Sequence, residues 1–420
     1  MRNALGTVGV LVLGLAGCAA QRPSTEPLAP PPPSEPPAAA LPPAATEPAP
    51  EPPKPPELTA EQKLQRFRDC WAAFNAKDMT QLGACYAEGA VVEIVDSGAP
   101  AAAGRNAILA KAIQPLFAAF PDASGEPLLT LMNGDQIVSV VSVRGTHQGT
   151  LETPRGEIAA TNKKTALTVA HAIDFAGGSV QRLDEYTDQK TLLVQLGVLP
   201  GAARKATAPE AGDRPVITAT NNDTERVNVE TFQKLVAAFN QHDAAAYEAL
   251  LAEDIVLSEA YAAADRVGRK EVMRGHKELW KGISDAKIQH TSLWGAGDYV
   301  VAMGTFSGTN DGPLPSMKLW NKTGKTITLR SLEIAKLESG KVKKHWVFAN
   351  GLAMAEQLGT LPPEKKPAAA KSAPTTNTSA AKPAPAAAPP KSNAASPPST
   401  PPAAAPKAAP PATPTPPAAQ

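Results

Sequence analysis

The pattern of apolar and polar positions between residues 58 and 201 predicts helices first and strands afterwards. Thr59 and Gln62 have the spacing of a capping box, and the apolar positions after them recur at helical period to about Ala76. Asp78 is placed to cap a second, short helix, and a third helix follows Gly104 and bends or ends near Pro115. Strands are predicted over 91–95, 127–132, 136–146, 163–175 and 179–186, before a short closing helix over 191–196. This order indicates an α+β fold in which helices cover one face of a curved, mostly antiparallel sheet.

The same series of short motifs occurs twice, about 163 residues apart. Four pairs of motifs are matched: Ala72-Ala73-Phe74-Asn75 with Ala237-Ala238-Phe239-Asn240, Gly104-Arg105 with Gly268-Arg269, Gly145-Thr146-x-x-Gly149 with Gly304-Thr305-x-x-Gly308, and Gln195-Leu196-Gly197 with Gln357-Leu358-Gly359. A repeat this long indicates a duplicated domain. We therefore expect two domains, at 58–201 and 223–362, joined by a linker over 202–222.

Proline is concentrated outside these two domains. Of the 44 prolines, 16 lie in residues 19–57 and 17 in 363–420. Segments rich in proline and alanine bury too little apolar surface to offset the entropy of ordering. We expect disorder over 18–57 and in the Pro/Ala/Lys-rich tail at 363–420.

The start of the chain has the features of an export signal. Residues 1–17 contain a short basic start, an apolar run and small residues before Cys18, and Leu15-Ala16-Gly17-Cys18 looks like a lipobox. We expect a signal peptide over 1–17, acylation of Cys18 and a lipid anchor in the bacterial cell envelope. Ala19 follows the cysteine in place of the aspartate associated with inner-membrane retention, so the outer membrane is the expected location.

A net charge of +1 argues against nucleic acid as a partner. The six histidines lack the spacing of metal ligands, and the chain has no P-loop, dinucleotide-binding glycine cluster or nucleophile elbow. We therefore expect no metal and no cofactor.

Three motifs of the first copy carry a family resemblance. Ala118-Ala119-Phe120-Pro121-Asp122, then Gly145-Thr146-His147-x-Gly149, then Asp188 seven residues before Gln195 resemble the SnoaL-like polyketide cyclases of the nuclear transport factor 2-like superfamily. The resemblance implies a cone-shaped domain with about three helices and a deep apolar pocket. Family members usually dimerise, so the tandem copies could pair with each other or the chain could form a homodimer. The second copy looks degenerate, with Ile283-Ser284-Asp285 in place of Phe-Pro-Asp.

The resemblance also implies a chemistry without metal or cofactor. Family cyclases use a carboxylate to remove an acidic C–H proton, and a carboxylate among apolar walls is a stronger base. Asp188 matches the catalytic aspartate, and His147 could polarise a carbonyl. Further pocket candidates are Trp71, His171, Glu185 and Tyr186. As alternatives, Asp188 could simply cap the closing helix, His147 could be a half-exposed polar residue, and His171 could be a core histidine.

The second copy provides an internal comparison for these residues. Counting back from Gln357 places Asn350 at the position of Asp188, and the Gly304-Thr305 match places Phe306 at that of His147. Neither replacement can perform the proton transfer. Catalysis is therefore expected in the first copy only, if it occurs at all.

Cys70 and Cys85 lie on neighbouring predicted helices and correspond to Leu235 and Leu250 of the second copy, so both are expected to face the core. In an exported protein they could form a disulfide, and two buried thiols are the alternative.

We expect a membrane-anchored lipoprotein that binds a small apolar or polyketide-like molecule in its first domain. One alternative is a cofactor-independent cyclase, isomerase or hydratase with Asp188 as general base. Another is a non-catalytic interaction platform in the envelope.

Overall fold

The computed structural model describes residues 58–204 and 212–361. The predicted signal peptide, Cys18, the proline-rich segment 18–57 and the tail 363–420 lie outside these residues. Within them, no helix is both long and apolar enough to cross a lipid bilayer.

The first domain places its helices before its long strands, as the sequence predicts. Its elements are α1 (Ala60–Ala76), α2 (Met79–Cys85), β1 (Tyr86–Ile94), β2 (Ala102–Ala103), α3 (Arg105–Ile108), the π-helix η1 (Leu109–Ile113), α4 (Gln114–Ala119), β3 (Ser124–Asn133), β4 (Gln136–Thr146), β5 (Leu151–Thr153), β6 (Gly156–Ile158), β7 (Lys164–Ala176), β8 (Ser179–Tyr186) and α5 (Gln189–Gln195). The Thr59–Gln62 capping box and the Asp78 cap are both formed.

The second domain repeats this order. Its elements are α6 (Asp223–Asn240), α7 (Ala244–Ala249), β10 (Leu251–Glu259), β11 (Arg266–Val267), α8 (Arg269–Gly282), β12 (Lys287–Ala296), β13 (Tyr299–Thr309), the 3-10 helix η2 (Pro315–Met317), β14 (Thr326–Glu338), β15 (Lys341–Phe348) and α9 (Gly351–Leu358). The α+β prediction with two tandem domains is confirmed.

Each domain contains one mixed sheet. The strand orders are β2-β1-β8-β7-β4-β3-β9 in the first domain and β11-β10-β15-β14-β13-β12 in the second. The strands β1 and β8 are parallel, as are β10 and β15, whereas the other pairs within each repeat are antiparallel.

The predicted linker 202–222 contains an additional strand, β9 (Val216–Thr218). This strand runs parallel to β3 and pairs Thr130 with Val216, so it forms the outer strand of the first domain's sheet. The linker is therefore partly structured, and it covers a sheet edge that would otherwise offer unpaired backbone groups.

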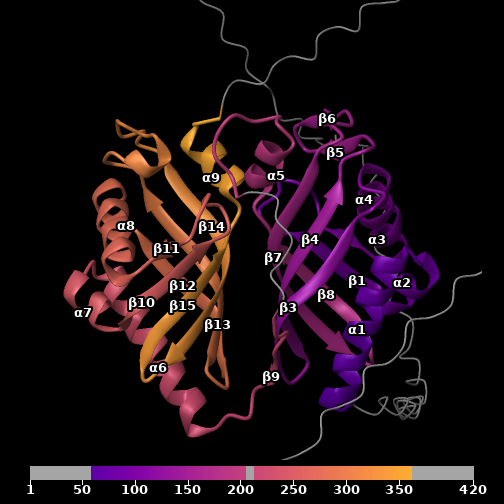
Figure 1. The fold of residues 1–420 in the computed structure, drawn as a ribbon, viewed down its shortest axis with the longest axis horizontal. Helices are drawn as coiled ribbons and strands as arrows, with labels where there is room; N and C mark the ends of the chain where they lie inside the picture. Colours follow the sequence, from indigo (N-terminus) through magenta and orange to yellow (C-terminus); the bar gives the residue numbers. More distant parts are fainter. Residues whose placement is uncertain (1–57, 205–211, 362–420) are drawn as a thin grey trace, which may run out of the picture.

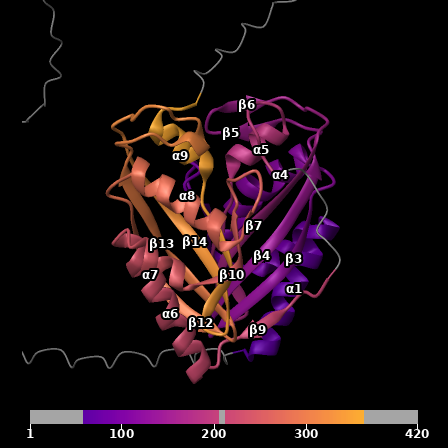
Figure 2. The same ribbon diagram turned by 60° about the vertical axis from the view of Figure 1, so that its left-hand side comes forward.

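The two domains pack sheet against sheet, with the helices α1–α4 and α6–α8 on the outer sides (Figures 1 and 2). One buried apolar cluster contains residues of both sheets, including Leu131 and Val140 from the first and Trp294 and Ile334 from the second. The Trp294 indole N–H also donates to the Gln136 side chain across the interface at 2.8 Å. The opposite, helix-covered face of each sheet forms the interior of its own domain.

The third helix shows how the fold absorbs one extra residue. The segment Arg105–Ala119 is one residue longer than α8 (Arg269–Gly282), and it contains the π-turn η1 directly before Pro115. A π-turn is a common result of a single-residue insertion in a helix. The α-helical pattern is thus interrupted just before Pro115, close to the predicted position, and continues as α4.

The repeated Ala-Ala-Phe-Asn motif has a structural explanation. The Asn75 side chain donates to the Gly125 carbonyl and accepts from the Gly125 N–H, at 2.9 and 2.8 Å. Asn240 makes the same two bonds with Ile288, at 2.8 and 2.7 Å. The asparagine thus pairs with the strand edge and fixes the helix on the sheet. These bonds also make Gly125 and Ile288 equivalent positions.

A cavity in the second domain

The structure forms a cavity of about 150 Å³ inside the second domain, between the sheet and the helices α6–α9. Its apolar wall includes Val236, Phe239, Leu257, Leu279, Ile288, Phe306, Leu314, Ile327, Leu329 and Met354. Polar side chains line the rest: Tyr247, Glu259, Tyr261, Arg266, His276, Ser316, Ser331, Glu333 and His345. An apolar enclosure with a few convergent polar groups is typical of small-molecule sites.

Glu333 is the most deeply buried carboxylate of this wall, with 4% of its surface exposed. Its two oxygens lie 2.9 Å from His345 Nε2 and 3.4 Å from His290 Nε2. Burial opposes ionisation, but the hydrogen bonds from His290 and His345 outweigh it and lower the Glu333 pKa to about 2. Glu333 is therefore held as an anion that orients two imidazoles.

A second polar group lies on β10, on β11 and in the turn between them. Tyr261 donates its hydroxyl proton to Glu259 at 2.8 Å, and Arg266 pairs with the other Glu259 oxygen at 2.5 Å. Burial, followed by the nearby Glu259 charge, raises the Tyr261 pKa. The phenol therefore stays neutral at pH 7.

Tyr247 and His276 form a third polar pair. The Nδ1 atom of His276 lies 2.9 Å from the Val272 carbonyl, which can only accept, so Nδ1 carries the proton. Nε2 then accepts from the Tyr247 hydroxyl at 3.2 Å. Burial lowers the His276 pKa and raises that of Tyr247, so both side chains are neutral.

The equivalent space of the first domain is filled by Trp71. Its ring stacks on His171 with 5.5 Å between centroids and lies 5.4 Å from the Phe74 ring. A Cβ atom added to Gly125 would lie 2.0 Å from the indole. In the second domain, Glu333 takes the place of His171, Phe239 that of Phe74, and Ile288 that of Gly125. All three line the cavity, as does Val236 at the position of Trp71. This cavity therefore lies in the second copy, not in the first, where the sequence placed the pocket.

The structure brings three of the predicted pocket residues together. His171 Nε2 lies 3.3 Å from a Glu185 oxygen, and Trp71 covers the His171 ring. Tyr186 points the other way and belongs to the apolar cluster between the domains. Neighbouring side chains on a strand face opposite sides, so Tyr186 could not share an interior with Glu185.

Asp188 lies where the two domains meet, and it is 3% exposed. Its carboxylate accepts the N–H groups of Thr191 at 2.9 Å and Lys190 at 3.3 Å, which makes it the N-cap of α5. It also accepts the N–H of Gly351 at 2.8 Å. Burial raises its pKa, against the opposing effect of these bonds. The capping role is present, and Asp188 is not among the residues that line the cavity.

His147 follows the end of β4 and is fully buried. Its Nδ1 accepts the N–H of Thr161 at 3.2 Å, and its ring lies 5.1 Å from that of Phe120. Burial lowers its pKa. The residue is therefore a neutral, interior side chain that holds a loop, and the half-exposed alternative is wrong.

The structure corrects the equivalence of His147 with Phe306. Thr146 donates its N–H to Asp122, and Thr309 donates its N–H to Asp285, each across 24 residues. These bonds equate Gly145-Thr146 with Gly308-Thr309, and therefore His147 with Asn310. Asn310 Oδ1 accepts the N–H of Thr323, as His147 Nδ1 accepts that of Thr161. The position therefore organises a loop in both domains.

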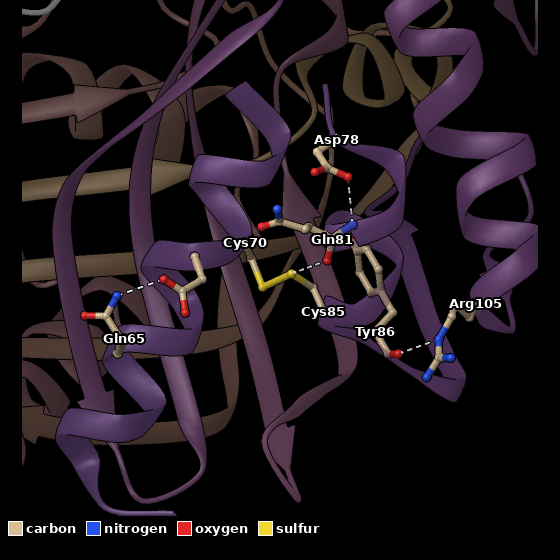
Figure 3. Close-up of a disulfide and its surroundings, with 8 residues drawn as sticks. Gln65, Cys70, Asp78, Gln81, Cys85, Tyr86 and Arg105 are labelled. Carbon is tan, nitrogen blue, oxygen red and sulfur yellow. Dashed lines mark hydrogen bonds between the residues drawn. A yellow bond between two sulfur atoms is a disulfide. The ribbon is translucent and has the colours of Figure 1, made fainter. Parts of the chain in front are cut away.

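The Sγ atoms of Cys70 on α1 and Cys85 on α2 form a disulfide with a Cα–Cα distance of 5.8 Å (Figure 3). No group of three or more His, Cys, Asp or Glu side chains within 58–204 and 212–361 is arranged to hold a metal ion.

The fold defines a pair of α+β domains of the same architecture in one chain, and the second of them contains the cavity. The family model described as SnoaL-like polyketide cyclase matches residues 229–358, and that described as SnoaL-like domain matches residues 65–183. The chain therefore carries two tandem SnoaL-like domains. The model named for the cyclases matches the second copy, which the sequence motifs had marked as degenerate.

Three solved structures illustrate the similarity. A protein from Jannaschia sp. CCS1 titled a SnoaL-like polyketide cyclase is 18% identical, with a TM-score of 0.31 and coverage of 34% of this chain and 97% of its own. TsrD from Streptomyces laurentii is 23% identical, with a TM-score of 0.29 and coverage of 33% and 98%. A protein of ketosteroid isomerase-like fold from Catenulispora acidiphila is 17% identical, with a TM-score of 0.28 and coverage of 33% and 98%. A comparison with curated proteins finds no match.

Proposed function

We propose that the second domain binds a small, largely apolar molecule that carries one or two polar groups. The observation that supports this is the cavity itself, which joins an apolar wall to the buried Glu333–His345 pair. Ligand binding, which the sequence motifs predicted for the first domain, is therefore proposed for the second domain.

The size of the cavity limits the ligand. A volume of about 150 Å³ matches that of engineered protein cavities that hold benzene. The neutral phenols and the neutral His276 imidazole of the wall suit a hydroxyl or carbonyl group better than a second full charge. The best candidates are single-ring molecules with a phenol or ketone, or one ring of a larger polyketide-like compound.

The experiment uses 4-fluorophenol as a probe and fluorine NMR of the full chain. The proposal predicts saturable binding, and it predicts loss of binding in Val236→Trp, which copies Trp71 into the cavity. The matched control is Trp71→Val, which changes the first domain and should leave binding in the second domain intact. Equal binding by wild type and a folded Val236→Trp chain would contradict the proposal.

A second candidate function is proton transfer within the same cavity. Glu333 itself is a poor base because its pKa is about 2. His345, oriented by Glu333 at 2.9 Å, is the better proton acceptor, as in other carboxylate–histidine pairs. Cofactor-independent isomerisation of an enolisable ketone is the reaction type that this pair suits.

Two variants separate this reaction from the general-base role predicted for Asp188. If His345 transfers the proton, His345→Gln abolishes turnover of an enolisable ketone, whereas Asp188→Asn retains catalysis at saturating substrate. The reverse result would favour Asp188. Binding of the ketone without turnover by any chain would leave the protein as a binding module.

We also propose that acylated Cys18 anchors the protein in the cell envelope, preferably at the outer membrane. The support is the lipobox sequence and the small residues before it. Cys18→Ala should move the protein from the membrane fraction to the soluble fraction. Continued membrane association of this variant would show that another element binds the membrane. Co-purification of an envelope protein with a chain whose cavity stays empty would instead favour the interaction-platform alternative.

A further inference from the structure

We propose that the first domain holds the cavity wall of the second domain in place, with Asp188 as the main positioning residue. This inference rests on the proposed function of the cavity. It assigns different roles to the two repeats: the second domain provides the cavity, and the first domain fixes its shape.

The first contact is at the start of α9. The helix begins at Gly351, whose N–H donates to Asp188 of the first domain at 2.8 Å. Ala349, just before the helix, and Met354, within its first turn, both line the cavity. The side chain of a first-domain residue therefore fixes the helix end that carries part of the second domain's cavity wall.

Asp188, Gly351 and Tyr261 form a continuous layer from the interface to the cavity. A Cβ atom added to Gly351 would lie 2.8 Å from Asp188 Oδ1 and 2.8 Å from the Tyr261 Cβ. Tyr261 in turn lines the cavity and donates to Glu259. Since there is no spare space in this layer, a shift of Asp188 must be transmitted to the tyrosine.

A second first-domain carboxylate holds another part of the wall. Asp96 accepts the backbone N–H of Arg330 at 2.7 Å and the Arg330 guanidinium at 3.3 Å. Glu93 pairs with the same guanidinium. Leu329 and Ser331, the neighbours of Arg330 on β14, line the cavity. Two separate parts of the wall are therefore tied to acidic residues of the first domain.

Figures 1 and 2 show the arrangement that makes this possible, because α5 and α9 lie side by side at one end of the paired sheets. Asn350, the residue before α9, donates to the Asp96 carbonyl and to the Gln189 side chain, each at 3.0 Å. The N-terminal ends of α5 and α9 therefore each form hydrogen bonds with residues of the other domain. The contact consists of direct hydrogen bonds between named groups, which suits transmission of a small displacement.

The test compares Asp188→Asn and Gly351→Ala with wild type in the full chain labelled with 3-fluorotyrosine. Asparagine presents one acceptor where Asp188 presents two, and alanine introduces a Cβ into the filled layer. We expect the fluorine resonance of Tyr261 to shift in both variants. We also expect the affinity for 4-fluorophenol to fall by about two- to thirtyfold, the range typical of coupling residues that do not touch the ligand.

Asp78→Asn is the matched control. Asp78 caps α2 of the first domain through the N–H groups of Thr80 and Gln81 and makes no described contact with the second domain. It should leave both the Tyr261 resonance and the probe affinity unchanged. Equal effects of Asp78→Asn and Asp188→Asn would overturn the inference, because the cause would then be general loss of stability.

The two readouts separate this inference from the proposed function. If wild type does not bind 4-fluorophenol, the proposed function fails, and the Tyr261 resonance alone decides the coupling. If Tyr261 and the probe affinity are both unchanged in Gly351→Ala and Asp188→Asn, the inference is wrong even where the cavity binds the probe. Should Asp188→Asn not fold, Gly351→Ala decides the matter.

Discussion

The Asp188 carboxylate accepts the N–H of Gly351, while Asn350, its counterpart in the repeat, donates through its amide in the opposite direction. Asp188 and Asn350 are both N-caps, and both are almost fully buried. Their difference is complementary, because the aspartate provides acceptors at the interface and the asparagine provides donors. The change from carboxylate to amide that removes a candidate base from the second copy is therefore also a device for joining the copies.

This relationship predicts that Asn350→Asp destabilises the protein. The new carboxylate would face the Asp96 carbonyl and the Gln189 side-chain oxygen, which now accept from the asparagine. We expect a loss of about 1–3 kcal/mol at neutral pH, the usual cost of unsatisfied buried groups. Urea unfolding measures it. A variant as stable as wild type would mean that these two bonds contribute nothing net.

Glu333 predicts a specific dependence of stability on pH. Its pKa in the folded protein, about 2, lies below that of an unfolded glutamate. The stability that it contributes is therefore complete above about pH 4.3 and is lost as the pH falls towards 2. The difference corresponds to about 3 kcal/mol at most.

Glu333→Gln should remove this contribution. The variant should be less stable than wild type at pH 7, and the gap should close on acidification between about pH 4 and pH 2. Thermal unfolding across this range is the measurement. A gap that stays constant with pH would mean that the carboxylate charge is not what stabilises the site.

His147 predicts opposite effects for two substitutions. Its Nε2 is buried and has no hydrogen-bond partner among the described residues, whereas its Nδ1 accepts from Thr161. In the second domain, Asn310 satisfies the same position completely, through Thr323, Gly282 and Gly312. We therefore expect His147→Asn to keep or raise the melting temperature. His147→Ala should lower it, because Thr161 loses its acceptor, at a cost of about 1–3 kcal/mol.

The His147→Asn variant also tests the predicted catalytic role of His147. If turnover of any substrate depends on the imidazole, His147→Asn abolishes it despite a stable fold. Retained turnover would restrict this residue to loop structure.

The disulfide predicts a stability difference that depends on redox conditions. A bridge between residues 15 apart contributes about 3 kcal/mol by the loop-entropy estimate. Reduction should therefore lower the stability of wild type. It should not affect Cys70→Leu/Cys85→Leu, which copies Leu235 and Leu250. Identical unfolding of wild type with and without reductant would show that the bridge contributes no net stability.

Local signals in the sequence were sufficient for most of the fold. The Thr59–Gln62 box and Asp78 define helix starts through their own side-chain bonds, and the strand periodicity depends on neighbours within a few residues. The second Gly-Thr pair was misaligned because Gly304-Thr305 and Gly308-Thr309 both fit the short motif. The spacing from Asp122 to Thr146, repeated from Asp285 to Thr309, would have selected the second pair.

The location of the cavity could not be predicted in the same way. It depends on the summed volume of residues that are distant in the sequence. The difference between Trp71 and Val236 determines which domain has the cavity, but this can be seen only once Gly125, Phe74 and His171 are known to surround the indole. The Asp188–Gly351 hydrogen bond could not be predicted either, since it joins residues 163 positions apart in two domains, and no local motif specifies how the domains pack on each other. A corrected alignment could still have shown Glu333 in the place of His171, a signal that the second copy carries its own buried acid.

The strand β9 affects how the two repeats can be separated. A first-repeat fragment cut at the repeat boundary, near residue 201, would lack the segment that pairs with β3 and would leave that strand's backbone open to other chains. Such a fragment should self-associate through β3. A fragment extended to residue 222 should not associate through this strand, and only the face that packs on the second domain stays exposed. The segment between the repeats therefore protects the sheet edge of the first domain in addition to connecting it to the second domain.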